Sequence, residues 1–329
     1  MSRFVRRWSA RRALLPLVLL LLGLPAPALA HGPDPGPPDA STLITGWSFH
    51  VEVWLPLILA AWGYRLAMHR VNAAHPHNPV PRFRWHAWLA GIVTLVIALA
   101  SPIERYDTTL FSVHMVQHLL IALVAAPLLV MGAPITLLLR VATPKARKRW
   151  ILPALHSRVM KVVANPVVTW CLFAIVMWET HFSSLFNAAL EDPFVHLLEH
   201  GLYLITAMLF WYPVVGADPG PYRLPHPARV GYLGLGMPFG SFLGLAIFSA
   251  TTVLYPHYAT NKLAWGPDAL TDQAYAGGIM WAFGDAVFLI GLILAVAVWL
   301  RSEEAKAKRI DAQLDREAAA GVQRAIDPT

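Results

Sequence analysis

The chain has 329 residues, of which 57% are hydrophobic and only 14% are charged, whereas soluble proteins carry about a quarter charged residues. This composition excludes an ordinary soluble domain, because the apolar residues gather in blocks of about 20, the length that spans a bilayer as a helix. The net charge of +7 does not indicate a nucleic-acid partner, since the basic residues lie beside the apolar blocks, and the single cysteine, Cys171, excludes a Cys-x-x-Cys metal motif.

The first 46 residues are expected to precede the membrane domain. Residues 1–30 have the pattern of a secretory signal peptide, with a basic start, a short apolar run over 13–24 and a small-x-small cleavage site at 28–30. Cleavage there would leave His31 as the first residue, and a free amine beside an imidazole is a possible auxiliary copper site. An accident of composition explains His31 more simply, because residues 31–46 form a periplasmic linker rich in proline and glycine.

The rest of the chain predicts an all-α fold, a polytopic membrane bundle of seven transmembrane helices over residues 47–300. The predicted spans are 47–66, 86–102, 110–131, 165–181, 194–214, 230–254 and 275–300. Pro127, Gly132 and Pro134 predict that span 3 bends or breaks before a short continuation.

Basic residues fix the predicted orientation of the bundle. The loops after spans 1, 3 and 5 are rich in Lys and Arg, whereas the alternate loops carry only Arg105 and Lys262. The basic loops are therefore predicted to be cytoplasmic, with the N-terminus in the periplasm and the protein in the bacterial inner membrane. Residues 301–329 form a charged cytoplasmic tail that is predicted to be a solvated helix.

Two histidine pairs lie at the same predicted depth, at the outer ends of spans 3 and 5. Span 3 opens with HMVQHLL and span 5 with FVHLLEHGLY, and the spacing of four places each pair on one helix face. An ionisable group inside an apolar span is costly and indicates function. Imidazole binds copper, zinc, iron and nickel, and copper(II) binds most tightly among its first-row neighbours. The predicted ligands of a copper site, with zinc not excluded, are His114, His118, His196 and His200.

Other residues at this depth could serve as auxiliary ligands or as hydrogen-bond partners of the ligands. Copper(I) also favours thioethers, and a metal-bound histidine normally gives its second N–H to a carboxylate or a carbonyl. Taken singly, each of the three histidines among them could instead be an interfacial residue, and each methionine could instead fill the helical core; for Asp285, the alternative is a hydrogen bond to a neighbouring helix. The candidates are His50, Met115, Gln117, His181, Glu199, His257, Met280 and Asp285.

The order of these motifs resembles the CtaG family of cytochrome c oxidase assembly factors, the polytopic family linked to caa-type oxidases. The matching stretches are HMVQHLL, APLLVMGAP, HLLEHGLYLITAMLFWYPVVGADP, LYP and AYAGGIMWAFGD, and the likeness covers residues 45–300. The resemblance implies a role in oxidase maturation, by delivering or inserting copper, with oxidase subunits or other copper chaperones as partners within the lipid membrane. The family's motifs correspond to His114, His118, His196, His200, Gly277, Gly278, Met280 and Trp281.

Three other functions stay open from the residues alone. A metal-free scaffold for assembly of oxidase subunits would not need the histidines for metal. A single haem could take one axial histidine from each pair. A membrane di-iron desaturase fits least, because its histidine boxes face the cytosol and include a His-x-x-His-His motif that this sequence lacks. The sequence shows no nucleophile–base constellation, so the protein is not expected to be an enzyme, and its oligomeric state is not predicted.

Overall fold

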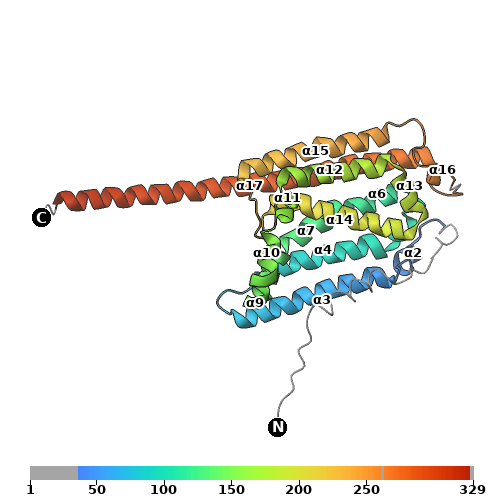
Figure 1. Cartoon of the computed structure of the whole chain (residues 1–329). Coiled ribbons are helices and arrows are strands. Elements are labelled where there is room, and N and C mark those ends of the chain that lie inside the picture. The colour runs from blue at the N-terminus through green and yellow to red at the C-terminus, as the bar shows by residue number, and fades with distance from the viewer. Residues whose placement is uncertain (1–35, 261–262, 327–329) are drawn as a thin grey trace, which may run out of the picture.

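The structure, a computed structural model, describes residues 36–260 and 263–326. The predicted signal peptide, His31 and the start of the linker lie outside these described residues. Every regular element in the described ranges is a helix, and the helices stand side by side in one bundle (Figure 1). The prediction of an all-α polytopic membrane bundle is confirmed.

Each predicted span coincides with a helix. Six helical segments in the described chain are long and apolar enough to cross a membrane, and the shorter apolar helix α12 coincides with the remaining predicted span at 165–181. With 17 residues, α12 is at the lower limit of about 17–25 for a spanning helix. The bundle consists of α3 (Val51–Ala74), α4 (Arg82–Ala100), α6 (Phe111–Leu119), η1 (Leu120–Ala125), α7 (Ala126–Met131), α12 (Pro166–Phe182), α14 (Pro193–Val215), α15 (His226–Phe248) and α17 (Ala269–Ile326).

The predicted break in span 3 is confirmed. The helix passes through the π-helical turn η1 into α7 and stops at Gly132, and Ala133 adopts a left-handed conformation with φ 52° before α8 (Pro134–Val141) begins. Asp218 caps α8, because its carboxylate accepts hydrogen bonds from the backbone N–H groups of Ile135 and Thr136 at 3.1 and 2.6 Å. The N-terminus of α8 is therefore stabilised separately from the helix that precedes it.

The boundaries of spans 6 and 7 differ from the prediction. Helix α15 ends at Phe248, six residues before the predicted end at 254, and α17 begins at Ala269 instead of 275. The segment between them is held by Gln273, which accepts from the N–H of Leu254 at 2.7 Å and donates to the carbonyl of Thr252 at 3.1 Å. Asp268 caps the start of α17 by accepting from the backbone N–H of Leu270. Hydropathy does not report such side-chain bonds.

Helices α15 and α17 pack closely through glycines. A Cβ atom on Gly277 would lie 2.5 Å from the backbone nitrogen of Phe248, and one on Gly244 would lie 2.9 Å from the carbonyl oxygen of Gly277. Only glycine allows this approach. Beyond the bundle, α17 continues as one helix through the predicted tail and projects far past its neighbours (Figure 1).

Short helices cover the two ends of the bundle (Figure 1). At one end lie α2 (Ala40–Thr45), α5 (Pro102–Tyr106), α13 (Ser184–Glu191) and α16 (Pro256–Thr260). At the other end lie α8, α9 (Pro144–Ala146), η2 (Arg147–Ile151), α10 (Leu152–Leu155) and α11 (Arg158–Val163). The predicted histidine pairs open α6 and α14 at the first of these ends.

Candidate metal site

The first turns of α6 and α14 carry the site, and acidic residues fix where both helices begin. Asp192 accepts from the backbone N–H groups of Phe194 and Val195 at 2.8 and 3.2 Å, and Pro193 fills the first helical position of α14. At the start of α6, Asp272 reaches across from α17 and accepts from the N–H of Phe111 at 2.6 Å. These caps set the positions of the histidines that follow one turn later.

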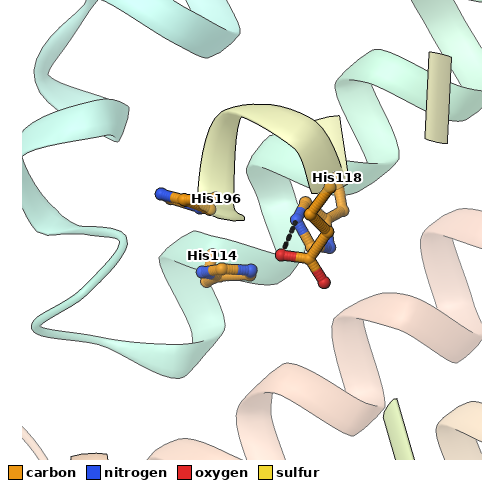
Figure 2. Close-up of side chains that lie close together, drawn as sticks. His114, His118 and His196 are labelled. Atoms are coloured by element: carbon orange, nitrogen blue, oxygen red, sulfur yellow. Dashed lines mark ion pairs between the residues drawn. The ribbon is translucent and has the colours of Figure 1, made fainter. Parts of the chain in front are cut away.

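Three histidines and one glutamate converge between these helices. His114, His118, His196 and Glu199 each offer one ligand atom, and these atoms all lie within 4.8 Å of one another. Figure 2 shows the three histidine rings gathered around the start of α14, with a dashed line for the pair between His118 Nε2 and Glu199 Oε2, which are 3.8 Å apart. None of the four residues is more than 5% exposed. We call these four residues the histidine cluster.

Several buried polar atoms of the histidine cluster make no hydrogen bond within the described structure. They are both ring nitrogens of His114 and His118 and both carboxylate oxygens of Glu199. Buried polar atoms in folded proteins almost always have a partner, and each one without a partner costs about 1–3 kcal/mol. A buried cation could bind these nitrogen and oxygen atoms through their lone pairs and so remove the cost of burying them without partners.

The spacing of the cluster suits a metal ion. Nitrogen and oxygen ligands lie about 2.0–2.2 Å from a zinc-sized ion, so two ligands in a tetrahedral shell are about 3.4 Å apart. The distance of 3.8 Å between His118 Nε2 and Glu199 Oε2 is therefore close to the spacing of two ligands of one ion. The buried histidine and glutamate side chains could hold a metal.

His200 lies beside the histidine cluster and not in it. Its ring centroid is 4.2 Å from that of His196 and 5.5 Å from that of His118, but its Nε2 bonds the side-chain oxygen of Gln117 at 3.0 Å. An amide oxygen can only accept, so Nε2 of His200 carries the proton and only Nδ1 has a lone pair. Glu199, expected as an outer partner, lies within the cluster, and the ligand role of His200 stays a prediction.

Two further acidic residues, Asp107 and Glu104, contact the histidines directly or through Gln117. Asp107 Oδ2 lies 3.9 Å from His196 Nε2, and the side-chain nitrogen of Gln117 donates to Glu104 at 3.0 Å and to the carbonyl of Ala98 at 2.9 Å. Burial, and then the charge of Glu104, raise the pKa of Asp107 well above its usual range. Sequence reasoning missed Glu104 and Asp107, although both stand in the short loop between spans 2 and 3, at the predicted outer side.

Two buried aromatic residues, Phe186 and Tyr255, cover the cluster on the side of α13 and α16. Phe186 on α13 is fully buried, and its ring centroid lies 5.0 Å from His114 and 5.7 Å from His181. Tyr255, which precedes α16, packs on Phe186 at 4.3 Å. The sequence placed the histidines at the membrane edge; the structure places them beneath α13 and α16, because those short helices fold over the end of the bundle.

Two of the auxiliary candidates make their contacts outside the cluster. His50, before α3, lies 3.7 Å from Glu52, and Nε2 of His257, on α16, bonds the backbone carbonyl of Thr108 at 2.9 Å.

Four other auxiliary candidates, Met115, His181, Met280 and Asp285, lie on α6, α12 and α17. His181 on α12 bonds the carbonyl of Met177 at 2.7 Å, and it shares the wall of a cavity with Met115 and Met280. Asp285 accepts a hydrogen bond from Ser241 on α15 at 2.6 Å, which is the neighbouring-helix contact that the sequence left as its alternative role.

Comparison with known proteins gives one family and several relatives. The family model described as cytochrome c oxidase caa3 assembly factor (Caa3_CtaG) matches residues 62–302. Uncharacterized proteins of Mycobacterium bovis, Mycobacterium tuberculosis and Mycobacterium leprae are each 31% identical over 288 residues, which is 85% of this chain and 43% of each relative. The chain thus spans less than half the length of these curated relatives. No solved structure matches the chain at a significant level.

Proposed function

Because this chain belongs to the family of cytochrome c oxidase caa3 assembly factors, we propose that it binds copper in the histidine cluster and passes it to the oxidase during assembly. The observation that carries this proposal is the convergence of buried ligand atoms without hydrogen-bond partners in His114, His118 and Glu199. Membership of the family supports a role in assembly and not in catalysis, so we propose a metal-handling protein that is not an enzyme.

The ligand set supports copper as the metal. Three imidazoles and a carboxylate suit copper(II) and zinc, and copper(II) has the higher affinity for such a site. His200 could join through Nδ1, and Gln117 would then hold the ring in place through the Nε2 bond. The acidic residues Glu104 and Asp107 would offset the charge of a divalent ion.

A haem is less well supported by this geometry. Two axial histidines would need a slot for the porphyrin between them. The cluster is instead packed by Phe186, and by Tyr203, whose ring centroid lies 4.4 Å from that of His118.

We propose that the end with the histidine cluster faces the periplasm of a bacterial inner membrane. The basic residues of the other end lie in α8 to α11, and the charged extension of α17 leaves the bundle at that same end (Figure 1). Basic loops are retained in the cytoplasm, so copper would enter from the periplasmic side. The partners would be oxidase subunits or other copper chaperones.

The test is the metal content of the full-length protein purified in detergent, measured by mass spectrometry after copper loading and removal of excess ion. The site variants are His114→Ala/His118→Ala and His196→Ala/Glu199→Gln. The control is His75→Ala/His77→Ala, a pair of exposed histidines in the loop between α3 and α4.

Near-stoichiometric copper in the parent and in the control, with loss in both site variants, would support the proposal. Copper that survives both site variants, or a parent that binds none, would overturn it and favour a metal-free assembly scaffold. A cluster that retains zinc in place of copper under competition would keep the site and replace the metal.

A further inference from the structure

A cavity of about 50 Å³ lies next to the histidine cluster, between α6, α12, α15 and α17. By the same measure a water molecule needs about 10–15 Å³, so the cavity has room for about three. Its wall is mainly apolar, and its polar or sulfur-bearing residues are His118, His181, Asp285, Met115, Met177, Met237, Met280 and Trp170. Four thioethers around one small cavity distinguish it from an ordinary packing defect.

His181 presents an unused lone pair at this cavity. Its side chain is 2% exposed, and Nδ1 lies 2.7 Å from the carbonyl oxygen of Met177. A carbonyl can only accept, so Nδ1 carries the proton and Nε2 is the bare nitrogen. Nε2 is buried and has no hydrogen-bond partner in the part of the chain that the structure describes. A histidine held in this tautomer by a backbone carbonyl is prepared to bind a metal through Nε2.

Three of the methionines gather near His181 from three different helices. Met115 on α6 is 1% exposed, Met280 on α17 is 4% exposed, and Met177 lies one turn before His181 on α12. All three pack in or against the same apolar cluster of side chains. Methionine often fills gaps in a core, but here the gap stays open among the methionines. A thioether binds hydrogen-bond donors only weakly and is a good ligand for soft cations.

We propose that this cavity is a second metal site, which binds copper(I) through His181 Nε2 and the thioethers of Met115, Met177 and Met280. Soft thioether ligands select copper(I), whereas the imidazoles and carboxylate of the histidine cluster suit copper(II) or zinc. A monovalent ion also carries less charge into the apolar interior than a divalent one. Asp285, the acidic residue on the cavity wall, would partly balance that charge.

The two sites are neighbours. His118 belongs to the histidine cluster and also lines the cavity, and its ring centroid lies 6.5 Å from that of His181. The inference rests on the proposed function and deepens it by naming copper(I) as a second form of the handled ion. The four proposed ligands of the cavity site are all distinct from those of the histidine cluster. Each site can therefore be tested without the other.

The experiment loads the full-length protein in detergent with copper(I) under anaerobic conditions. The parent used here and every variant carry Cys171→Ser, because the exposed Cys171 is the one thiol of the sequence. X-ray absorption spectroscopy identifies sulfur ligands, and competition with a coloured copper(I) chelator measures affinity. The variants are His181→Ala and the volume-conserving Met115→Leu/Met280→Leu. The matched control is Met208→Leu, a half-buried methionine on α14 that does not line the cavity.

We expect sulfur scattering in the parent and in the Met208→Leu control. The methionine variant should lose most of the sulfur scattering, and both cavity variants should bind copper(I) at least about tenfold more weakly, the scale seen when groups that support a metal site are removed. A parent without sulfur ligands, or an affinity that neither cavity variant changes, would overturn the proposal. The methionine pair keeps the test valid even where His181→Ala fails to fold.

His196→Ala separates this inference from the proposed function. It removes a ligand of the histidine cluster and leaves the cavity intact, so it should lose the copper(II) signal in electron paramagnetic resonance and keep the copper(I) sulfur signal. Loss of both signals together would show that the cluster and the cavity form one site. The proposal of a second site would then be wrong, and the proposed function would stand.

Discussion

Two buried carboxylates, Asp218 near one end of the bundle and Glu199 near the other, differ in their hydrogen bonding. At the end with α8 to α11, Asp218 is 4% exposed, and its two oxygens accept from the backbone N–H groups of Ile135 and Thr136. At the end with α13 and α16, Glu199 is 2% exposed, and neither oxygen accepts a hydrogen bond within the described structure. The first carboxylate is fully used by the fold, whereas the second is available to a ligand.

The histidines follow the same division. His75 and His77, in the loop between α3 and α4, are exposed to solvent and carry no cost of burial. His114 and His118 are buried, and their ring nitrogens make no hydrogen bonds with the described residues. Burial without partners is destabilising, so the comparison indicates that stability does not account for the buried His114 and His118.

The largest expected effect is on metal affinity at the histidine end. Glu199→Gln keeps the shape of the side chain and removes its charge, and removal of groups that only support a metal site already costs about 10–100-fold. We expect a loss on the order of 100-fold in copper affinity, measured by competition with a chelator in detergent. Glu191→Gln, an exposed glutamate at the end of α13, is the control and should leave affinity unchanged. An unchanged affinity in Glu199→Gln would remove Glu199 from the ligand set.

The second prediction concerns stability without metal. Glu199→Leu replaces a buried carboxylate that lacks partners by an apolar side chain, so the metal-free protein should gain about 1–3 kcal/mol. The measurement is the thermal midpoint of unfolding, followed by tryptophan fluorescence in detergent with a chelator present, and a rise of a few degrees is expected. A fall would mean that Glu199 has a structural partner and that the contrast with Asp218 is wrong.

The third prediction measures the thermal midpoint after removal of Asp218, the carboxylate whose two oxygens both accept hydrogen bonds. Asp218→Ala leaves two N–H groups at the start of α8 without an acceptor, and loss of such a cap costs about 0.5–2 kcal/mol. The thermal midpoint should fall, in contrast to the rise in Glu199→Leu, and copper affinity should not change. Loss of copper in Asp218→Ala would show that the two ends are coupled.

The sequence predicted the parts of this fold that depend on local composition. The length of the apolar blocks gave each transmembrane helix, and Gly132 with Pro134 located the break in span 3. The end of α15 could not be predicted in this way, because Gln273 holds the following segment from a distant position along the chain. Hydropathy reports burial in lipid and not which side chains bond the backbone.

For the candidate site, the sequence predicted which residues share a helix face, but not which of them contact the neighbouring helix. Spacing places His196, Glu199 and His200 on one face of α14, but it does not show which of them points at α6. That choice depends on Gln117, which bonds Nε2 of His200, and this contact between helices has no signature in the sequence. The carboxylate of Asp107 was missed for a similar reason, since it reaches His196 only because its loop folds back over the bundle.

The smallest expected effect lies in the charged extension of α17, where a third carboxylate completes the comparison. Lys306 donates to Glu303 at 2.7 Å, and both side chains are more than half exposed. Exposed pairs of this kind contribute about 0–1 kcal/mol, because water already solvates both charges. Lys306→Ala should therefore change neither the thermal midpoint beyond about 1 °C nor copper affinity. A clear loss of stability would mean that this part of α17 packs against another molecule. The contribution of a carboxylate to the stability of this protein would then depend on contacts with other molecules as well as on burial.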